Sequence, residues 1–358
     1  MKKIFAVFIA AVLAAGCLAG CGSDKGQNEP AEDKLQIVTT IFPEYDWVMN
    51  ILGDNPAGAE VSMLLDNGVD LHSYQPTAED IMKISECDMF VYVGGESDEW
   101  VEDALEEVSN KDMVVVNLME VLGDSVKEEE VVEGMQESEH HHDHDGDEDH
   151  DEDANHDEEH DADADHNDDA DEHEHEEGET EYDEHVWLSL KNAAAVVQHI
   201  SDALQTIDTA NADVYKNNTS EYISKLENLD KEYTDAVNSA SCHTLLFGDR
   251  FPFRYMVDDY GLDYYAAFVG CSAETEASFE TITFLSKKAD ELSLGAVMTI
   301  EGKDHSIAET IIKNTQSKDM KILTLDSMQS TTAEDVQNGT EYLAIMEKNL
   351  AALKEALN

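Results

Sequence analysis

Short apolar runs rich in β-branched residues alternate with amphipathic stretches along most of the chain. Four such runs occupy 35–40, 61–65, 89–93 and 113–117, and four more occupy 243–247, 264–269, 296–300 and 321–325. The stretches between them predict helices at 43–53, 77–86, 97–109, 253–260, 277–290 and 305–314. Strands that alternate with helices indicate βαβ units and a parallel sheet. We therefore expect an α/β protein with two similar lobes, each a parallel sheet flanked by helices.

A different pattern lies between the two sets of runs. Apolar and aromatic side chains recur there at spacings of three, four and seven residues: Tyr215, Tyr222, Leu226, Leu229, Tyr233 and Val237. This spacing predicts one amphipathic helix over 211–239, about 43 Å long at 1.5 Å per residue. A rigid helix between two lobes limits how far they can open.

The charge of the chain is unevenly distributed. Its 358 residues include 82 acidic and 21 basic side chains, for a formal net charge of −61. Residues 137–184 alone carry 27 of the acidic side chains and 10 of the 15 histidines, with no Lys or Arg. This run is too polar to bury a core, and we expect it to be a disordered insertion in the first lobe. The acidic excess argues against nucleic acid as a partner, because phosphate binding needs Lys and Arg.

The first 21 residues have the pattern of an export signal. Lys2 and Lys3 precede an apolar run, 4–15, that is too short to span a bilayer. The sequence LAGC at 18–21 resembles a bacterial lipobox, which implies cleavage before Cys21 and a lipid on its sulfur. An ordinary secretory signal with a chance cysteine is the alternative. The lipobox predicts a mature chain at the extracytoplasmic face of the cell membrane, with 22–34 as a polar tether.

Three cysteines remain in the body of the chain, Cys87, Cys242 and Cys271. An odd number makes a poor disulfide framework. Cys242 opens one predicted strand and Cys271 follows the end of the next, so we expect them at opposite edges of a sheet, too far apart to bridge. We interpret all three as buried free thiols.

Side chains that can bind a ligand follow the predicted strands at their carboxyl ends, where open parallel α/β sheets hold ligands. In the first lobe, Asp70 and His72 follow the strand at 61–65, and His185 follows the acidic run. The second lobe offers Asp249, Glu301, Asp304 and His305. Two imidazoles with carboxylates suit zinc or another first-row divalent ion, whereas calcium and magnesium prefer oxygen ligands.

Three segments carry a family resemblance: VTTIFP at 38–43, GVDLHSYQPT at 68–77 and DEHVWLS at 183–189. With the histidine-rich acidic run just before the third segment, the chain resembles the metal-receptor lipoproteins of zinc and manganese ABC importers, in their zinc-uptake branch. The resemblance covers essentially the whole mature chain. It implies two lobes joined by a rigid helix, a metal cleft between them, and a bound metal ion that is handed to a membrane permease.

The resemblance makes His72 the first metal ligand and His185 the second. The zinc branch has a third His, and the manganese branch a Glu, just after the first strand of the second lobe, and Gly248 occupies that place here. The fourth ligand of the manganese branch, an Asp, falls on Asp304. Further candidates in the second lobe are Asp249, Glu301 and His305. Cys271 lies at the same sheet edge, and a thiolate would favour zinc, but we do not count it among the expected ligands.

The histidines of the acidic run have no fixed spacing, and they begin with His140, His141, His142, His144 and His150. A disordered chain of this kind assembles many weak zinc sites rather than one set geometry. Two interpretations stay open: a metal-collecting loop, and a solubilising insertion with no metal role. A collecting loop acts through an electrostatic field that reaches only about 10 Å at moderate salt, so it needs to lie near the cleft.

We therefore expect a monomeric, lipid-anchored receptor that captures a divalent metal ion, Zn²⁺ before Mn²⁺, and delivers it to an ABC permease without catalysis. The expected parts are a signal peptide 1–21, a tether 22–34, a first lobe 35–210 containing the run 137–184, a linking helix 211–239 and a second lobe 240–358. The alternatives are a manganese receptor, a surface adhesin that uses metal for rigidity, and a metallohydrolase with Glu301 as general base. No known hydrolase pattern supports the last of these.

Overall fold

The computed structural model describes residues 34–106, 108–136, 181–272 and 276–358. Residues 35–358 form one compact unit. The expected signal peptide, Cys21, most of the tether and His140, His141, His142, His144 and His150 of the acidic run lie outside the described residues. None of the described helices is both long and apolar enough to cross a bilayer.

The first sheet consists of four parallel strands in the order β2-β1-β3-β4. Val38 of β1 pairs with Phe90 of β3, and both side chains are buried, as expected for a parallel sheet covered by helices. The strands are β1 (Gln36–Thr39), β2 (Glu60–Met63), β3 (Met89–Tyr92) and β4 (Val114–Asn117). The helices of this lobe are α1 (Phe42–Leu52), α2 (Ala78–Glu86), α3 (Trp100–Glu106), α4 (Leu118–Leu122) and α5 (Leu190–Ile207).

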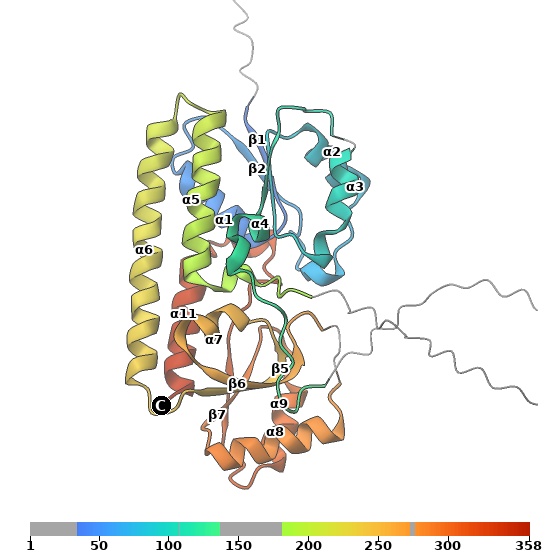
Figure 1. The fold of residues 1–358 in the computed structure, drawn as a ribbon, viewed down its shortest axis with the longest axis vertical. Helices are drawn as coiled ribbons and strands as arrows, with labels where there is room; N and C mark the ends of the chain where they lie inside the picture. Colours follow the sequence, from blue (N-terminus) through green and yellow to red (C-terminus); the bar gives the residue numbers. More distant parts are fainter. Residues whose placement is uncertain (1–33, 107, 137–180, 273–275) are drawn as a thin grey trace, which may run out of the picture. The chain divides into compact units, whose positions relative to one another are not determined.

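The second sheet repeats this arrangement, with four parallel strands in the order β6-β5-β7-β8 (Figure 1). Its strands are β5 (Thr244–Phe251), β6 (Asp263–Val269), β7 (Ala296–Thr299) and β8 (Lys321–Thr324). The helices that follow are α7 (Arg254–Tyr260), α8 (Phe279–Leu292), α9 (Ser306–Asn314), α10 (Ala333–Gln337) and α11 (Tyr342–Ala356). The prediction of two similar α/β lobes is confirmed.

One strand differs from its predicted extent. We expected a strand at 243–247 with Gly248, Asp249 and Arg250 in the loop beyond it, but β5 continues to Phe251. The pairing with β6 shifts register between Phe247 and Arg250, so one extra residue bulges out of β5. The chain thus keeps its strand direction past Gly248, and this changes where the following side chains point.

The long helix predicted between the lobes is α6 (Ala212–Ser239). Its aromatic and aliphatic stripe is buried, including Tyr215, Tyr222 and Tyr233. It packs against α5 and α1 of the first lobe and against α11 and α7 of the second, so it runs alongside both (Figure 1). The Tyr233 hydroxyl donates a hydrogen bond to the Met346 carbonyl oxygen of α11 at 2.6 Å, which ties the two helices together.

Helices α5 and α11 were not predicted from the sequence, although both have regular apolar faces. Leu190, Val197 and Leu204 are buried on α5, and Leu350 and Leu353 are buried on α11. These helices complete the layer around α6, because α5 packs against α6 along its length and α11 packs against α1 as well as α6.

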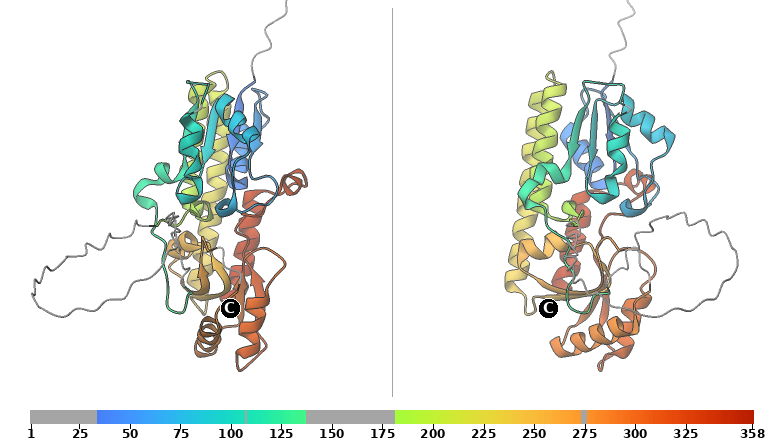
Figure 2. Two further views of the ribbon diagram at one scale, coloured as in Figure 1. Left: turned by 90° about the vertical axis from the view of Figure 1, so that its right-hand side faces the viewer. Right: turned by 45° about the vertical axis from the view of Figure 1, so that its right-hand side comes forward.

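Residues 127–136, named the strap here, leave the first lobe and lie along the second, a course that Figure 2 shows in green. The Lys127 ammonium pairs with Asp258 of α7 at 2.6 Å, and the Gln136 N–H donates to the Ala267 carbonyl oxygen of β6 at 3.0 Å. At its start the strap pairs in antiparallel fashion with the returning chain, where Glu128 lies opposite Tyr182. The residues that flank the acidic run therefore cross between the lobes in both directions.

Candidate metal centre

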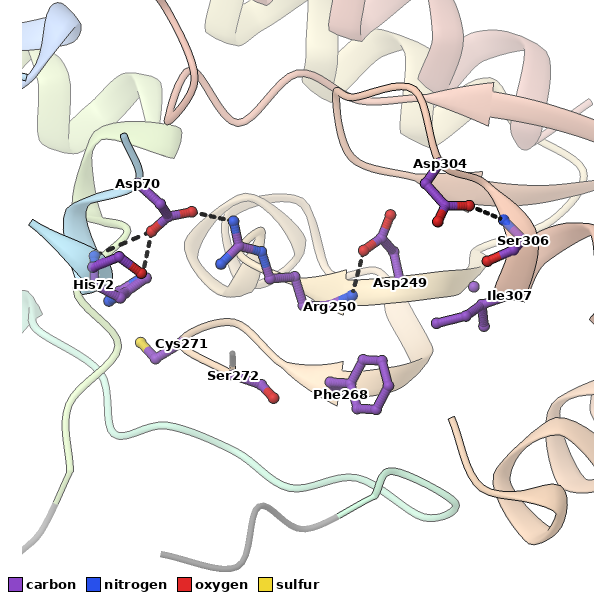
Figure 3. Close-up of a pocket in the computed structure, with 12 residues that line it drawn as sticks. Asp70, His72, Asp249, Arg250, Phe268, Cys271, Ser272, Asp304, Ser306 and Ile307 are labelled. Carbon is purple, nitrogen blue, oxygen red and sulfur yellow. Dashed lines mark hydrogen bonds and ion pairs between the residues drawn. The ribbon is translucent and has the colours of Figure 1, made fainter. Parts of the chain in front are cut away.

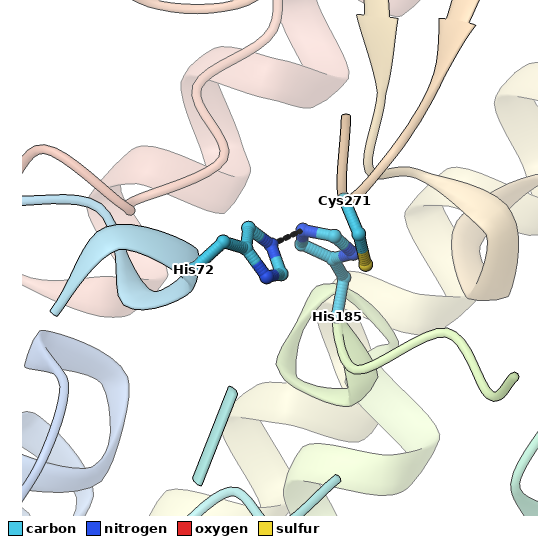
Figure 4. A group of neighbouring side chains, drawn as sticks. All are labelled: His72, His185 and Cys271. Carbon is cyan, nitrogen blue, oxygen red and sulfur yellow. Dashed lines mark hydrogen bonds between the residues drawn. The ribbon is translucent and has the colours of Figure 1, made fainter. Parts of the chain in front are cut away.

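Loops at the carboxyl ends of strands in both lobes meet around one cluster of three side chains. His72 lies in a single turn, Leu71–Ser73, that follows β2. His185 precedes a second such turn, Val186–Leu188, and Cys271 comes two residues after the end of β6. The imidazoles point toward each other and the Cys271 side chain lies beside His185 (Figure 4). Each of the three residues offers one possible ligand atom, and these atoms all lie within 4.8 Å of one another. Among the described residues, no fourth side chain belongs to this group.

The two imidazoles have the spacing of a metal site. Nε2 of His72 lies 3.2 Å from Nε2 of His185. Two nitrogens bound at 2.0–2.1 Å to one tetrahedral zinc ion are separated by about 3.3 Å. Two nitrogen lone pairs at this separation repel each other unless a proton or a metal ion lies between them. The arrangement thus presents both Nε2 atoms to a single cation.

Carboxylates lie behind both rings. Asp183 Oδ1 is 3.0 Å from Nδ1 of His185, and it also accepts the backbone N–H of the same residue. Glu184 Oε2 is 3.2 Å from Nδ1 of His72, whose other neighbour is the Ser97 hydroxyl at 2.7 Å. A carboxylate beside Nδ1 favours the tautomer with its hydrogen there, which leaves the Nε2 lone pair for a metal.

The charge state of Glu184 suits this task. Burial opposes its charge, but hydrogen bonds from His72 and from Ser97 hold the pKa of Glu184 below its ordinary value. One of these bonds comes from the Ser97 backbone N–H to Oε1 at 2.8 Å. Glu184 is therefore a carboxylate at neutral pH although its side chain is buried.

Trp187 fixes the second imidazole from the other side. Its ring centroid lies 5.3 Å from that of His185, and its Nε1 donates to the Ser327 carbonyl oxygen at 2.9 Å. Sequence reasoning left open whether Trp187 supports the site or only fills the core. It does both, because it is fully buried and joins the His185 segment to a loop of the second lobe.

Cys271 reaches the histidines through a glycine. A Cβ atom on Gly270 would lie 3.0 Å from Cε1 of His185 and 2.9 Å from the Phe251 carbonyl oxygen, so a larger residue would push the loop away. Burial and the nearby carboxylates of Asp183, Glu129 and Glu184 raise the pKa of the Cys271 thiol well above its ordinary value. The metal-free protein thus holds a neutral thiol, which a bound cation would convert to thiolate by displacing the proton.

The second-lobe residues expected from the sequence serve other roles. Glu301 fixes the loop after β8, because its carboxylate accepts hydrogen bonds from the Ser327 N–H at 2.6 Å and from the Ser327 hydroxyl at 2.7 Å. Asp249 accepts the N–H of Arg250 and, from the residue after β7, the N–H of Ile300, and Asp304 accepts the Ser306 N–H at the start of α9. His305 directly precedes α9. In the described part of the chain, neither His305 nor any of these three carboxylates belongs to the three-residue group.

Gly248 shows why the expected third ligand is absent. A Cβ atom there would lie 2.6 Å from the Ala308 Cα of α9, so the close approach of α9 to β5 leaves no room for a side chain. The cluster obtains its third member instead from Cys271, two residues beyond the neighbouring strand. We expected Cys271 at this edge of the sheet, where it lies, but did not count it among the ligands; its position directly after a parallel strand is the feature that brings it to the histidines.

Arg250 points from β5 across the cleft, as Figure 3 shows. Its Nη2 pairs with the Asp70 carboxylate of the first lobe and with Oε1 of Gln329 at 3.0 Å. Burial opposes the charge of Asp70, but Arg250 and His72 hold its pKa below the ordinary value. This ion pair therefore ties the lobes together beside the cluster.

The family described as zinc-uptake complex component A, periplasmic (ZnuA) matches residues 37–356. The match extends over both sheets, the long helix α6 and the three-residue cluster. The chain belongs to this family, and the resemblance drawn from the three sequence motifs is confirmed.

Two curated relatives give the scale of the similarity. The zinc-binding lipoprotein AdcA of Streptococcus pneumoniae is 30% identical over 358 residues, which cover 99% of this chain and 61% of AdcA. The high-affinity zinc uptake system protein ZnuA of Bacillus subtilis is 30% identical over 359 residues, which cover 99% of this chain and 98% of the relative. This chain thus spans less than two thirds of AdcA.

Solved structures have the same fold. The Zn(II)-bound ZnuA-like domain of Streptococcus pneumoniae AdcA is similar with a TM-score of 0.63 and 26% identity, over 90% of this chain and 99% of that one. The metal-dependent lipoprotein YcdH from Bacillus subtilis is similar with a TM-score of 0.66 and 25% identity, over 91% of this chain and 100% of that one.

Proposed function

We propose that this chain is the metal receptor of a zinc importer and that it binds one Zn²⁺ through His72, His185 and Cys271. The separation of 3.2 Å between the two Nε2 atoms, with carboxylates behind both rings, is the observation that carries the proposal. Relatives at 30% identity are named for zinc binding and for zinc uptake, which supports the same metal.

The donor set favours zinc over manganese. Two imidazole nitrogens and a thiolate suit zinc, whereas manganese prefers oxygen ligands. The manganese alternative depended on second-lobe carboxylates, and among the described residues neither Asp304 nor Glu301 belongs to the three-residue group. The Cys271 thiolate is therefore the ligand that favours zinc over manganese.

The remaining parts of the proposal concern delivery. The receptor works as a monomer on the extracytoplasmic face of the membrane, anchored by a lipid on Cys21, and hands zinc to an ABC permease. It performs no catalysis. The expected division of the chain, with a first lobe 35–210, a linking helix 211–239 and a second lobe 240–358, belongs to the same proposal.

The acidic run contributes by collecting zinc for the cleft. The described end of the run and the strap that precedes the run both adjoin the cluster, because Asp183 contacts His185 and the Glu129 carboxylate accepts the Cys271 N–H at 3.4 Å. Removal of 138–180 should slow zinc uptake by cells under severe zinc limitation and leave uptake in zinc-rich medium unchanged. Equal uptake under limitation would leave the run as a solubilising insertion.

The decisive experiment is a competition titration. The mature chain that begins at Cys21 without its lipid, and the same chain without 138–180, are titrated with Zn²⁺ against a chelator of known affinity, with Mn²⁺ in parallel. We expect one tight zinc site in both proteins, lost in His72→Ala, and weaker Mn²⁺ binding. The proposal would be contradicted if zinc binding were lost when 138–180 is removed and were unchanged in His72→Ala.

A further inference from the structure

A cavity lies directly beside the metal cluster and is far larger than a metal ion needs. Its volume is about 350 Å³, and its walls include two of the three cluster residues, His72 and Cys271. The remaining walls come from Asp70 and Ser73 of the first lobe and, in the second lobe, from β5, the end of β6 and the start of α9 with the loop before it. Cavities of this size are at the lower end of the range that holds small organic molecules.

Arg250 places a positive group in the wall of this cavity. One nitrogen of its guanidinium, Nη2, is occupied by Asp70 and Gln329. Within the described residues, Nε and Nη1 have no hydrogen-bond partner. A guanidinium binds carboxylates through two parallel N–H groups, so Arg250 retains the capacity to hold one more carboxylate.

Negative groups line another part of the same cavity. Asp249 and Asp304 contribute carboxylates to the wall, from β5 and from the loop before α9 (Figure 3). Their hydrogen bonds to backbone N–H groups leave lone pairs that can accept further donors. The cavity therefore offers separate partners for a carboxylate and for an ammonium group.

The cluster itself supplies a third point of attachment. Zinc is tetrahedral in protein sites of this kind and takes four ligands, whereas the described part of the chain brings three ligand atoms together. Because His72 and Cys271 are cavity walls, a molecule in the cavity lies next to the metal position.

We propose that this cavity binds a free α-amino acid with a metal-coordinating side chain, so that zinc is carried as a mixed complex. The side chain completes the coordination of zinc, the carboxylate pairs with Arg250, and the ammonium group faces Asp249 and Asp304. This inference rests on the proposed function, since it needs zinc at the cluster. A histidine residue inside a peptide shares the imidazole but lacks the two charged groups, which lets an experiment separate the two sources.

The test uses the full mature chain loaded with one equivalent of Zn²⁺ and freed of excess metal, with zinc retention checked after each titration. Isothermal titration calorimetry with L-histidine should give one bound molecule per zinc-loaded chain and no binding to the metal-free chain. Histamine lacks the carboxylate and imidazolepropionate lacks the ammonium group, and each should bind about tenfold more weakly or worse. N-acetyl-histidinamide, the peptide-like probe, lacks both charges and should bind most weakly.

The Arg250→Gln variant separates the role of the guanidinium from general damage. It should weaken L-histidine about tenfold and leave histamine unchanged, so that the preference for the carboxylate disappears. Lys303→Gln, which removes an exposed positive charge outside the cavity wall, is the matched control and should behave as the unaltered chain. The analogue series on the unaltered chain remains decisive even where Arg250→Gln folds poorly.

Each result is informative. A chain that holds zinc but binds no L-histidine, or binds L-histidine and N-acetyl-histidinamide equally, overturns the inference and leaves the proposed function standing. A chain that fails to hold zinc in the initial loading overturns the proposed function and the inference with it.

Discussion

The two lobes contribute in different ways to the cluster of His72, His185 and Cys271. The first-lobe segments supply His72 and His185 from short turns, each with a carboxylate fixed behind its ring by neighbouring backbone N–H groups. The second lobe supplies Cys271 from a strand end, and Arg250 of the same lobe pairs with Asp70 across the cleft. One half is built by local sequence motifs and the other by how two strands and a helix pack. Substitutions should therefore act differently on the two halves.

The largest effect is expected from His185→Ala. The imidazole is fully buried and has both a carboxylate and a tryptophan placed against it, so its loss removes a fixed ligand of the proposed zinc site. Zinc affinity in a chelator competition should fall by more than the 10–100-fold typical of substitutions behind a metal ligand. His199→Ala, on the exposed face of α5, is the control and should bind zinc normally. An unchanged affinity in His185→Ala would mean that the cluster is not the zinc site.

Cys271→Ser tests whether the second-lobe half matters as much. A hydroxyl binds zinc far more weakly than a thiolate, so we expect a loss of affinity close to that of His185→Ala. Cys242→Ser is the matched control, because Cys242 is also a free thiol, its sulfur is hydrogen-bonded to the Thr244 backbone, and it is not a member of the three-residue group. Cobalt loading gives a second measurement, since thiolate ligation produces a charge-transfer absorption that Cys271→Ser should abolish. If that band persists, Cys271 is not a ligand.

Glu184→Gln should have an intermediate effect. The amide keeps the shape of the side chain but removes the charge behind His72, which lowers the basicity of the imidazole and the affinity for zinc by about 10–100-fold. The same change at Glu106, exposed at the end of α3, should leave the affinity unchanged. An equal loss in both variants would attribute the effect to overall charge instead of to the position behind the ring.

The smallest effect on zinc is expected from Gly248→His, which puts an imidazole at the place where the sequence resemblance led us to expect a third ligand. The new side chain meets the backbone of α9 near Ala308 and cannot enter the cluster without moving that helix. We expect zinc affinity to stay the same or fall slightly, and the free energy of unfolding to drop by about 1–3 kcal/mol. Gly295→His, where the added atom meets no neighbour, should retain full stability in the same denaturant titration. A gain in zinc affinity would show that α9 yields.

The sequence predicted most of the fold because parallel strands buried on both faces leave a clear apolar signature. The strands lie within two residues of their expected positions, apart from β5. The extension of β5 depends on a bulge between Phe247 and Arg250, and no periodicity encodes a bulge. The helices α5 and α11 were not predicted although their apolar faces are regular, because neither lies between two strands of one sheet.

The site was predictable as far as its motifs extend. His72 and His185 lie within short segments that fix their own turns, so their convergence could be read from residue order. Whether Glu301 or Cys271 lies beside the two histidines depends on the direction of its side chain. The Glu301 carboxylate points to the loop at Ser327, where it accepts a hydrogen bond from the Ser327 hydroxyl. Sheet-edge reasoning names the candidates, but only the packing of β5, β6 and α9 selects among them.

The strap has a mechanical consequence. In the described residues, polypeptide passes between the lobes outward along the strap, back through the segment before α5, and outward again along α6. Three crossings turn the two lobes into a closed linkage, in which a swing about one crossing is opposed by the other two. We therefore expect small-angle scattering curves of the zinc-free and zinc-loaded chain to superimpose. The rate at which metal enters and leaves would then be set by the rearrangement of side chains around the Arg250–Asp70 pair, without movement of one lobe relative to the other.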